Sequence, residues 1–232
     1  MDALTALLGY MNLPLHLAVF VTTPLELLSF LLSVATVWLN IRQSHWAWLF
    51  AIVSSATYGL VFFGSRLYGD MGLQLVFIAV SIYGWYQWLH GDGRDHALPV
   101  TALSVRGRWL AMVGWLAGFL LLAWFLKTWT DTDVPHSDGF LTAGSLVGQL
   151  LLSRKKVENW HVWIIVDVLY VGLYLHKNLM LTAILYAIFV GMAMVGLRAW
   201  QQSAGMPTGG GGGGGGGDNG GGGGRGRRLV LE

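Results

Sequence analysis

The chain has 232 residues, of which 54% are hydrophobic and 11% charged, and its mean hydropathy is +0.56. These values exclude an ordinary soluble domain, because too few charged side chains are present to cover a globular surface. The lack of cysteine in the sequence excludes disulfides, thiol nucleophiles and thiolate metal sites, and the net charge of +2 predicts no nucleic-acid partner.

Apolar segments long enough to cross a bilayer follow one another along most of the chain. A membrane-spanning helix needs about 20 mostly apolar residues, and seven segments approach or meet this length. They are residues 24–41, 46–63, 70–89, 109–128, 138–153, 160–176 and 179–199. Residues 3–21 are interrupted by Asn12, Pro14 and His16, so we interpret them as an interfacial segment, with an eighth span as the alternative. No basic residue precedes Arg42, which argues against a removable signal peptide.

The basic residues predict the orientation, because Lys and Arg collect in cytoplasmic loops. With seven spans, far more basic residues fall on the side of the C-terminus than on the other side. The first group is Arg42, Arg94, Arg106, Arg108, Arg154, Lys155, Lys156, Arg198, Arg225, Arg227 and Arg228, and the second is Arg66, Lys127 and Lys177. We therefore expect a multi-pass membrane protein with its N-terminus outside and its C-terminus in the cytoplasm.

The sequence also contains an internal repeat. Sliding the chain along itself until Ser33 meets Ser145, with no gaps, aligns the first three spans with the last three. The identities in this register are Ser33/Ser145, Arg42/Arg154, Trp48/Trp160, Ile52/Ile164, Tyr58/Tyr170, Leu67/Leu179, Leu73/Leu185, Phe77/Phe189, Gly84/Gly196 and Trp88/Trp200. Two paired tryptophans are hard to obtain from apolar composition alone. The pattern predicts an all-α integral membrane protein with seven helices in a 3+1+3 arrangement, in which the fourth helix lets two three-helix repeats run parallel.

Five parts of the chain follow from this pattern. They are an N-terminal interfacial segment (1–23), a first three-helix repeat (24–90), a linker with the fourth helix (91–136), a second three-helix repeat (137–202) and a glycine-rich tail (203–232). The tail is mostly glycine between Gly209 and Gly226 and has no phosphate-binding pattern, so we interpret it as a flexible tail.

One acidic residue, Asp167, lies in the centre of a span and marks the candidate site. Placing an aspartate at the bilayer centre costs about 2.5 to 3.5 kcal/mol on insertion scales, so such a residue is a functional candidate. Asn159, Trp163, Asp167 and Tyr170 fall on one face of the same helix. For Asp167 alone, a hydrogen bond to a neighbouring helix is an equally good explanation.

Other spans also carry inward polar stripes. Aromatic rings beside a carboxylate suit a flat or cationic ligand, and side-chain amides can bind its donors and acceptors. The predicted substrate-binding residues are Asn40, Gln74, Ser81, Trp85, Trp88, Gln149, Asn159, Trp163, Asp167 and Tyr170. We expect no catalytic residues, no metal site and no cofactor, because the histidines lack metal-ligand spacing and Asp167 has no second acid in the membrane.

Three segments of the sequence resemble the PnuC family of bacterial nicotinamide riboside transporters. They are Leu67-Tyr68-Gly69-Asp70 with Leu73-Gln74, the run Tyr83-Gly84-Trp85-Tyr86-Gln87-Trp88, and Arg154-Lys155-Lys156-Val157-Glu158-Asn159-Trp160-His161-Val162-Trp163 followed by Asp167. The resemblance covers about residues 24–200. It implies a fold similar to the SWEET sugar transporters, a place in the bacterial inner membrane, and facilitated diffusion of nicotinamide riboside into the cytoplasm by alternating access.

This substrate suggests a role for each predicted residue. We expect Trp85, Trp88, Trp163 and Tyr170 around the pyridinium ring, Gln74 and Asn159 on the carboxamide or ribose, and Asp167 on the ribose hydroxyls or the positive charge. The alternatives are transport of another vitamin such as thiamine, an intramembrane enzyme that uses Asp167, and a receptor or assembly subunit that transports nothing. Uncoupled transport is favoured, and the bundle could form a homo-oligomer.

Overall fold

The computed structural model describes residues 15–17, 20–22, 24–64, 68–91, 98–130, 134–176 and 180–206. In these ranges the chain forms seven long helices and one short pair of strands. The elements are β1 (Leu15–Leu17), β2 (Phe20–Thr22), α2 (Pro24–Ile41), α3 (Trp46–Gly64), α4 (Tyr68–His90), α5 (Val105–Trp129), α6 (Pro135–Ser153), α7 (Glu158–His176) and α8 (Met180–Ser203). Each of the seven predicted spans is a helix, and the observed bounds differ from the predicted ones by at most about one helical turn.

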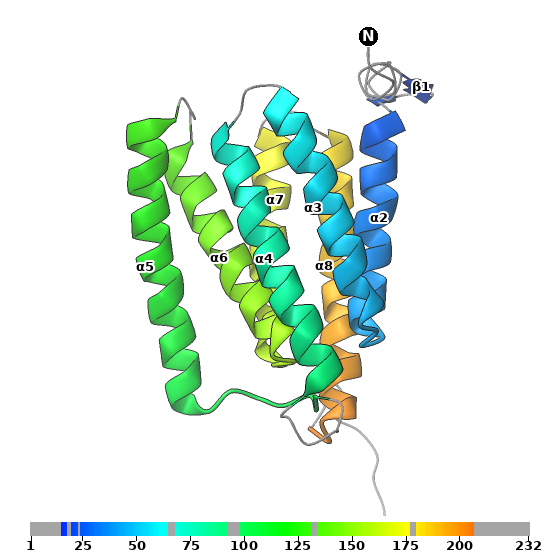
Figure 1. Ribbon diagram of the computed structural model, residues 1–232, viewed down its shortest axis with the longest axis vertical. Helices are drawn as coiled ribbons and strands as arrows, with labels where there is room; N and C mark the ends of the chain where they lie inside the picture. Colours follow the sequence, from blue (N-terminus) through cyan, green and yellow to red (C-terminus); the bar gives the residue numbers. More distant parts are fainter. Residues whose placement is uncertain are drawn as a thin grey trace, which may run out of the picture.

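The helices lie side by side and run alternately up and down, so that α2, α4, α6 and α8 end at one face of the bundle (Figure 1). α5 stands at the edge of the bundle and packs mainly on α6. Within each group of three, neighbours along the chain pack together, α2 on α3 on α4 and α6 on α7 on α8. The two groups join through α2 on α8 and α4 on α6.

The helix lengths match a bilayer. At 1.5 Å per residue, helices of 18 to 25 residues measure roughly 27 to 37 Å, against a hydrocarbon core of about 30 Å. Among the described residues, Val105–Trp129 and Ala183–Ser203 are apolar and long enough to qualify as membrane spans on composition alone. Phe30–Ile41 and Trp46–Thr57 are also apolar but shorter.

The segment before α2 differs from a continuous helix. Leu15–Leu17 and Phe20–Thr22 pair as antiparallel strands, with Leu15 opposite Thr22 and Leu17 opposite Phe20. A membrane helix that reaches residue 21 is therefore excluded. The rest of the predicted interfacial segment (1–14, 18, 19 and 23) lies outside the described residues, as does the tail from residue 207.

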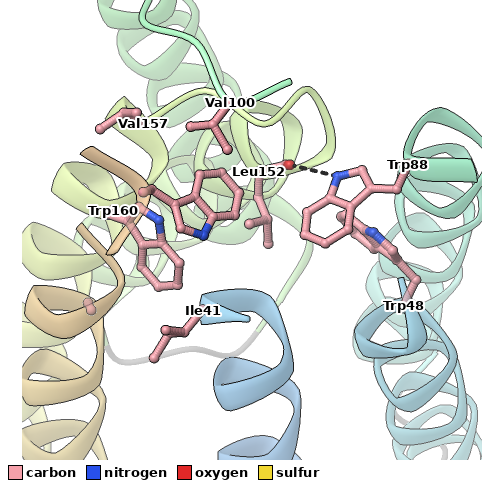
Figure 2. Close-up of a cluster of buried hydrophobic side chains, with 9 residues drawn as sticks. Ile41, Trp48, Trp88, Val100, Leu152, Val157 and Trp160 are labelled. Carbon is pink, nitrogen blue, oxygen red and sulfur yellow. Dashed lines mark hydrogen bonds between the residues drawn. The ribbon is translucent and has the colours of Figure 1, made fainter. Parts of the chain in front are cut away.

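Four tryptophans form the centre of the buried core at the end of the bundle where α2 ends (Figure 2). The rings of Trp48 and Trp88 meet edge to face, with centroids 5.5 Å apart and planes at 90°, and those of Trp160 and Trp200 do the same at 5.5 Å and 88°. Trp88 and Trp200 bring the two pairs together, at 6.0 Å. We call Trp48, Trp88, Trp160 and Trp200 the tryptophan cluster.

Two glycines make room for this cluster. A Cβ atom at Gly84 would collide with the indole of Trp48, and one at Gly196 would collide with the indole of Trp160. Both glycines are buried on their helices, α4 and α8. Because the two glycines are aligned by the internal repeat, like the tryptophans they accommodate, the same close approach occurs once in each group of three helices.

Crosswise hydrogen bonds join the two groups at the tryptophan cluster. Trp88 Nε1 donates to the main-chain carbonyl of Leu152 at 3.2 Å (Figure 2), and Trp200 Nε1 donates to that of Asn40 at 3.1 Å. In the register of the repeat, Leu152 is the counterpart of Asn40, as Trp200 is of Trp88. Each group thus holds the end of the other group's first helix with an equivalent bond.

Candidate functional site

A cavity of about 360 Å³ lies between six of the helices, above the tryptophan cluster. Its volume lies within the range of small-molecule sites, roughly 300 to 1,000 Å³. All described helices except α5 contribute to the wall. The lining residues are Ser33, Thr36, Val37, Asn40, Ala51, Ser54, Ser55, Phe77, Ser81, Ser145, Gln149, Leu152, Trp160, Trp163, Asp167, Tyr170, Tyr186, Phe189 and Ala193.

Six of the ten predicted substrate-binding residues line this cavity. They are Asn40, Ser81, Gln149, Trp163, Asp167 and Tyr170. α7 contributes the largest share of this chemistry, because Trp163, Asp167 and Tyr170 repeat at helical spacing and face inward together. The wall therefore combines a carboxylate, two side-chain amides and several aromatic rings.

The other four predicted residues lie outside the lining. Trp88 belongs to the tryptophan cluster, and Trp85 packs against it. Asn159 is fully buried in the first turn of α7, where its Nδ2 donates to the carbonyl of Lys156 at 2.6 Å. Gln74 is half-buried on α4 and lies beside Gly59 of α3. Trp85 and Trp88 lie at the end of α4 that meets the tryptophan cluster. Asn159 lies in the first turn of α7, directly before Trp160, which does line the cavity.

Asp167 is the acidic residue of the cavity wall. The residue is only 5% exposed, and within the described residues its carboxylate has no ion-pair partner. A buried carboxylate without a fixed cation is costly. The position thus suits a ligand that brings hydroxyl groups or a positive charge.

Aromatic side chains cover the cavity on the side away from the tryptophan cluster. Tyr170 and Tyr186 line it, with ring centroids 4.6 Å apart, and Tyr174 stacks on Tyr170 at 5.7 Å. Phe189 meets the edge of Tyr186 at 5.7 Å. Flat apolar faces therefore bound the cavity at both ends, with the polar groups between them.

Lys155 lies next to the tryptophan cluster, in the turn between α6 and α7. Its Nζ lies 4.7 Å from the centroid of the Trp88 ring, and the residue is 6% exposed. Burial lowers the pKa of Lys155 below its usual 10.5. The turn places Lys155 at a φ of 47°, and the equivalent turn between α2 and α3 places Gln43 at 55°.

Several lining residues were missed by the sequence analysis, in particular Trp160, Ser54, Ser55 and Tyr186. The repeat contained a usable signal for one of them, because its register aligns Ser55 with Asp167 and therefore gives both the equivalent helical position. Among the described residues no three His, Asp or Glu side chains converge, so this part of the chain offers no set of metal ligands.

The fold and the cavity together define a helical membrane protein with a polar and aromatic cavity between its helices. The model of the family described as nicotinamide mononucleotide transporter matches residues 23–202, so the chain belongs to this family. The resemblance to PnuC seen in the sequence is thereby confirmed, and membership places the chain among transporters and points away from an enzyme.

Similar proteins include two characterised transporters and one solved structure. The riboflavin/roseoflavin transporter RibM of Streptomyces davaonensis is 29% identical over 73% of this chain and 81% of its own length. The nicotinamide riboside transporter PnuC of Escherichia coli is 27% identical over 68% and 76%, respectively. A crystal structure of the vitamin B3 transporter PnuC has a TM-score of 0.62 at 22% identity, covering 77% of this chain and 80% of the other, which shows a shared fold.

Proposed function

We propose that the chain carries nicotinamide riboside across the bacterial inner membrane into the cytoplasm by facilitated diffusion. The observation that supports this most is the cavity wall, where Trp163, Asp167 and Gln149 lie on two adjacent helices. Nicotinamide riboside has a flat cationic ring, an amide and a sugar. A tryptophan face attracts the first, amide and indole groups bind the second, and a carboxylate binds sugar hydroxyls or balances the charge.

Alternating access is the proposed mechanism, with the two groups of three helices as parallel repeats. The paired tryptophans, the paired glycines and the crosswise hydrogen bonds all recur in the register of the repeat, which supports this 3+1+3 arrangement. A cavity between two parallel repeats can open to either side when the repeats move against each other. The fourth helix, α5, then serves as the connection that restores the direction of the chain.

The charges at the ends of the bundle support a cytoplasmic C-terminus. The described basic residues at the face where α2 and α8 end are Arg42, Arg106, Arg108, Arg154, Lys155, Lys156 and Arg198, whereas Lys127 lies at the opposite face. Positive residues favour the cytoplasmic side. In this orientation the tryptophan cluster closes the cavity toward the cytoplasm.

Riboflavin is the second candidate substrate. The relative RibM, named as a riboflavin/roseoflavin transporter, matches this chain at slightly higher identity than the E. coli PnuC does. Riboflavin also has a flat ring system with amide groups and a polyol chain, so the same cavity chemistry applies. Its larger ring would demand more room than the smaller ring of nicotinamide riboside does.

Equilibrium binding to the purified protein tests the proposal. We expect nicotinamide riboside to bind more tightly than riboflavin or thiamine, and Trp163→Ala to weaken binding. Uptake into sealed vesicles should stop at equal concentrations and should not respond to an imposed pH gradient. Accumulation above the outside concentration would contradict uncoupled transport, and tighter binding of riboflavin would transfer the proposal to the flavin.

A further inference from the structure

Residues 98–104, which we call the strap, run along one end of the bundle to the start of α5 (Figure 1). The strap pairs with the turn between α6 and α7 through an isolated parallel bridge. Thr101 N donates to the carbonyl of Lys155 at 3.1 Å, and Val157 N donates to the carbonyl of Thr101 at 3.0 Å. Lys156 Nζ adds a bond of 2.7 Å to the Thr101 hydroxyl. The turn is therefore attached to the strap along its main chain.

Glu158, the first residue of α7, extends this attachment to α5. Both of its carboxylate oxygens accept from Leu103 N at 3.0 Å, and Oε1 also pairs with Arg108 Nε at 3.2 Å. Val100 of the strap is 9% exposed and belongs to the same buried cluster as Val157 (Figure 2). Main-chain pairing, a charged acceptor and apolar burial act together here. The strap, the turn and the start of α5 therefore form one unit.

The other side of the same turn contacts α4 through weaker interactions. Arg154 Nε donates to the Tyr83 hydroxyl at 3.3 Å, and Arg154 is exposed. Lys155 Nζ lies over the Trp88 ring, and no carboxylate of the described residues forms an ion pair with Lys155. An exposed hydrogen bond contributes little, and burying a cation without an anion is costly. The turn is thus attached firmly to the strap and weakly to α4.

The weak side of the turn lies on the boundary between the two groups of three helices. α4 belongs to the first group, and the turn joins two helices of the second. Trp88 Nε1 crosses the same boundary when it donates to the carbonyl of Leu152. In alternating access the two groups separate at one end of the cavity at a time. Opening at this end breaks contacts across the boundary, whereas contacts within one unit can persist.

We propose that Arg154 and Lys155 form a latch that releases α4 when the cavity opens to the cytoplasm, while the strap keeps the turn on α5 throughout the cycle. This inference rests on the proposed function and specifies which contacts break. Lys155 favours release, because its cation returns to water when the latch opens. The buried charge thereby keeps the closed state from becoming too stable to open.

Two cross-links on the same turn test the latch, and the lack of cysteine in the sequence makes each of them specific. Thr101→Cys with Lys156→Cys joins the turn to the strap, because the partners of a parallel bridge lie close enough for a disulfide. Tyr83→Cys with Arg154→Cys, joined by a bifunctional methanethiosulfonate reagent, ties the turn to α4. A reductant reverses both links. Each double variant therefore serves as the control for the other.

The measurement is uptake into vesicles that contain the cross-linked full chain. We expect the link to α4 to reduce uptake of nicotinamide riboside at least about tenfold, with recovery in reductant, because it blocks a conformational step. The link to the strap should leave uptake unchanged. Full uptake with the link to α4, or loss of uptake with the link to the strap, would overturn the latch.

Lys155 gives a second test that needs no cross-link. Lys155→Met removes the buried cation and keeps a flexible side chain. We expect it to raise the melting temperature and to slow uptake about fivefold with unchanged equilibrium binding, because the closed state becomes more stable. Gln43→Met, in the equivalent turn, removes no charge and should not slow uptake. If a double variant does not transport in its reduced form, Lys155→Met decides, and uptake at the wild-type rate would overturn the latch.

The same assay separates the latch from the proposed function. Riboflavin is measured beside nicotinamide riboside. If wild type transported riboflavin alone, the proposed substrate would be wrong, and the cross-links would test the latch with the flavin. If wild type transported neither, the proposed function and the latch would both be overturned.

Discussion

The two groups of three helices share a core but differ in the cavity. At the tryptophan cluster the residues and contacts are the same in both, down to the glycine under each indole. Along the cavity wall, the equivalent pairs Ser33/Ser145 and Phe77/Phe189 are identical, but five other pairs hold different residues. The pairs are Val37/Gln149, Asn40/Leu152, Ala51/Trp163, Ser55/Asp167 and Ser81/Ala193.

The equivalent contacts at the tryptophan cluster support our proposal of a duplicated scaffold, and the five unequal pairs indicate that most of the proposed binding chemistry is not duplicated. At each of these pairs one group places a polar or aromatic side chain and the other a smaller or apolar one. α7 provides Trp163 and Asp167, and α3 provides Ala51 and Ser55 at the equivalent positions. If the α7 side chains bind the substrate as we propose, the small side chains of α3 leave room for it, and a symmetric scaffold can hold an asymmetric ligand in one orientation.

Substitutions of Gly84 and Gly196 test the core that the two groups of helices share, and we expect them to have the largest effect on stability. Gly84→Ala and Gly196→Ala place a methyl group against an indole, and we expect each to destabilise the protein by about 2 to 3 kcal/mol, as in overpacked cores. Gly72→Ala and Gly191→Ala, on the same two helices with open space around them, are the controls. Thermal unfolding in detergent measures all four, and similar melting temperatures would show that the indoles can move aside.

Asp167 and Ser55 test the asymmetry of the wall. A hydrogen bond to a charged group contributes about 1.5 to 3 kcal/mol. We therefore expect Asp167→Ala to weaken substrate binding by about 10-fold to 100-fold, and Ser55→Ala to change it little. Equilibrium binding to the purified variants is the measurement. Equal losses from the two substitutions would mean that both groups of helices contribute alike.

The two crosswise hydrogen bonds should contribute equally to the stability of the folded protein. Trp88→Phe and Trp200→Phe each remove one N–H donor, and we expect each to reduce stability by about 1 kcal/mol. The acceptor carbonyls keep a second partner, since Lys155 N donates to Leu152 and Gln43 N to Asn40. Trp85→Phe, whose Nε1 has no partner in the described residues, is the control and should cost less. Unequal melting temperatures for the first two variants would contradict the equivalence.

Lys155 tests the turn between α6 and α7, where its counterpart between α2 and α3 is Gln43, and its effect should be the smallest. Because burial lowers the pKa of Lys155, the folded chain binds this proton less tightly than the unfolded chain. Stability should therefore rise with pH as it approaches 10.5, the ordinary pKa of a lysine. Lys155→Gln introduces the residue of the equivalent turn, Gln43, and should be more stable at neutral pH with a weaker pH dependence. Identical pH profiles of the melting temperature would contradict this.

The helices, and six of the ten predicted residues that line the cavity, could be predicted from the sequence because their signals are local. A run of apolar residues predicts a span wherever it packs, and a single aspartate in such a run is conspicuous. The helical period placed Trp163, Asp167 and Tyr170 on one face, and the structure confirms that all three line the cavity. The paired strands Leu15–Leu17 and Phe20–Thr22 were missed, because short apolar strands resemble an interrupted helix in composition.

The level of a residue along the helix axis was harder to predict than its face. Trp85 and Trp88 lie near the end of α4, where they belong to the core and not to the cavity wall, and Asn159 is buried without lining the cavity. Periodicity specifies the angle around a helix but gives no information on the depth at which neighbouring helices leave space. Trp160 was paired with Trp48 by the repeat, but only packing shows that one of the two reaches the cavity.

The sequence by itself determined the class of the protein, its seven helices, its repeated pattern and the presence of one aspartate, Asp167, in the centre of a span, because hydropathy and periodicity act within each segment. Only the tertiary structure decided which residues face a common space and which buried atoms lack partners. Those properties depend on contacts between segments that are distant in the chain, such as Trp88 with Leu152 and Trp200 with Asn40. Only the structure shows that the small side chains of Ala51 and Ser55 line the same cavity as Trp163 and Asp167.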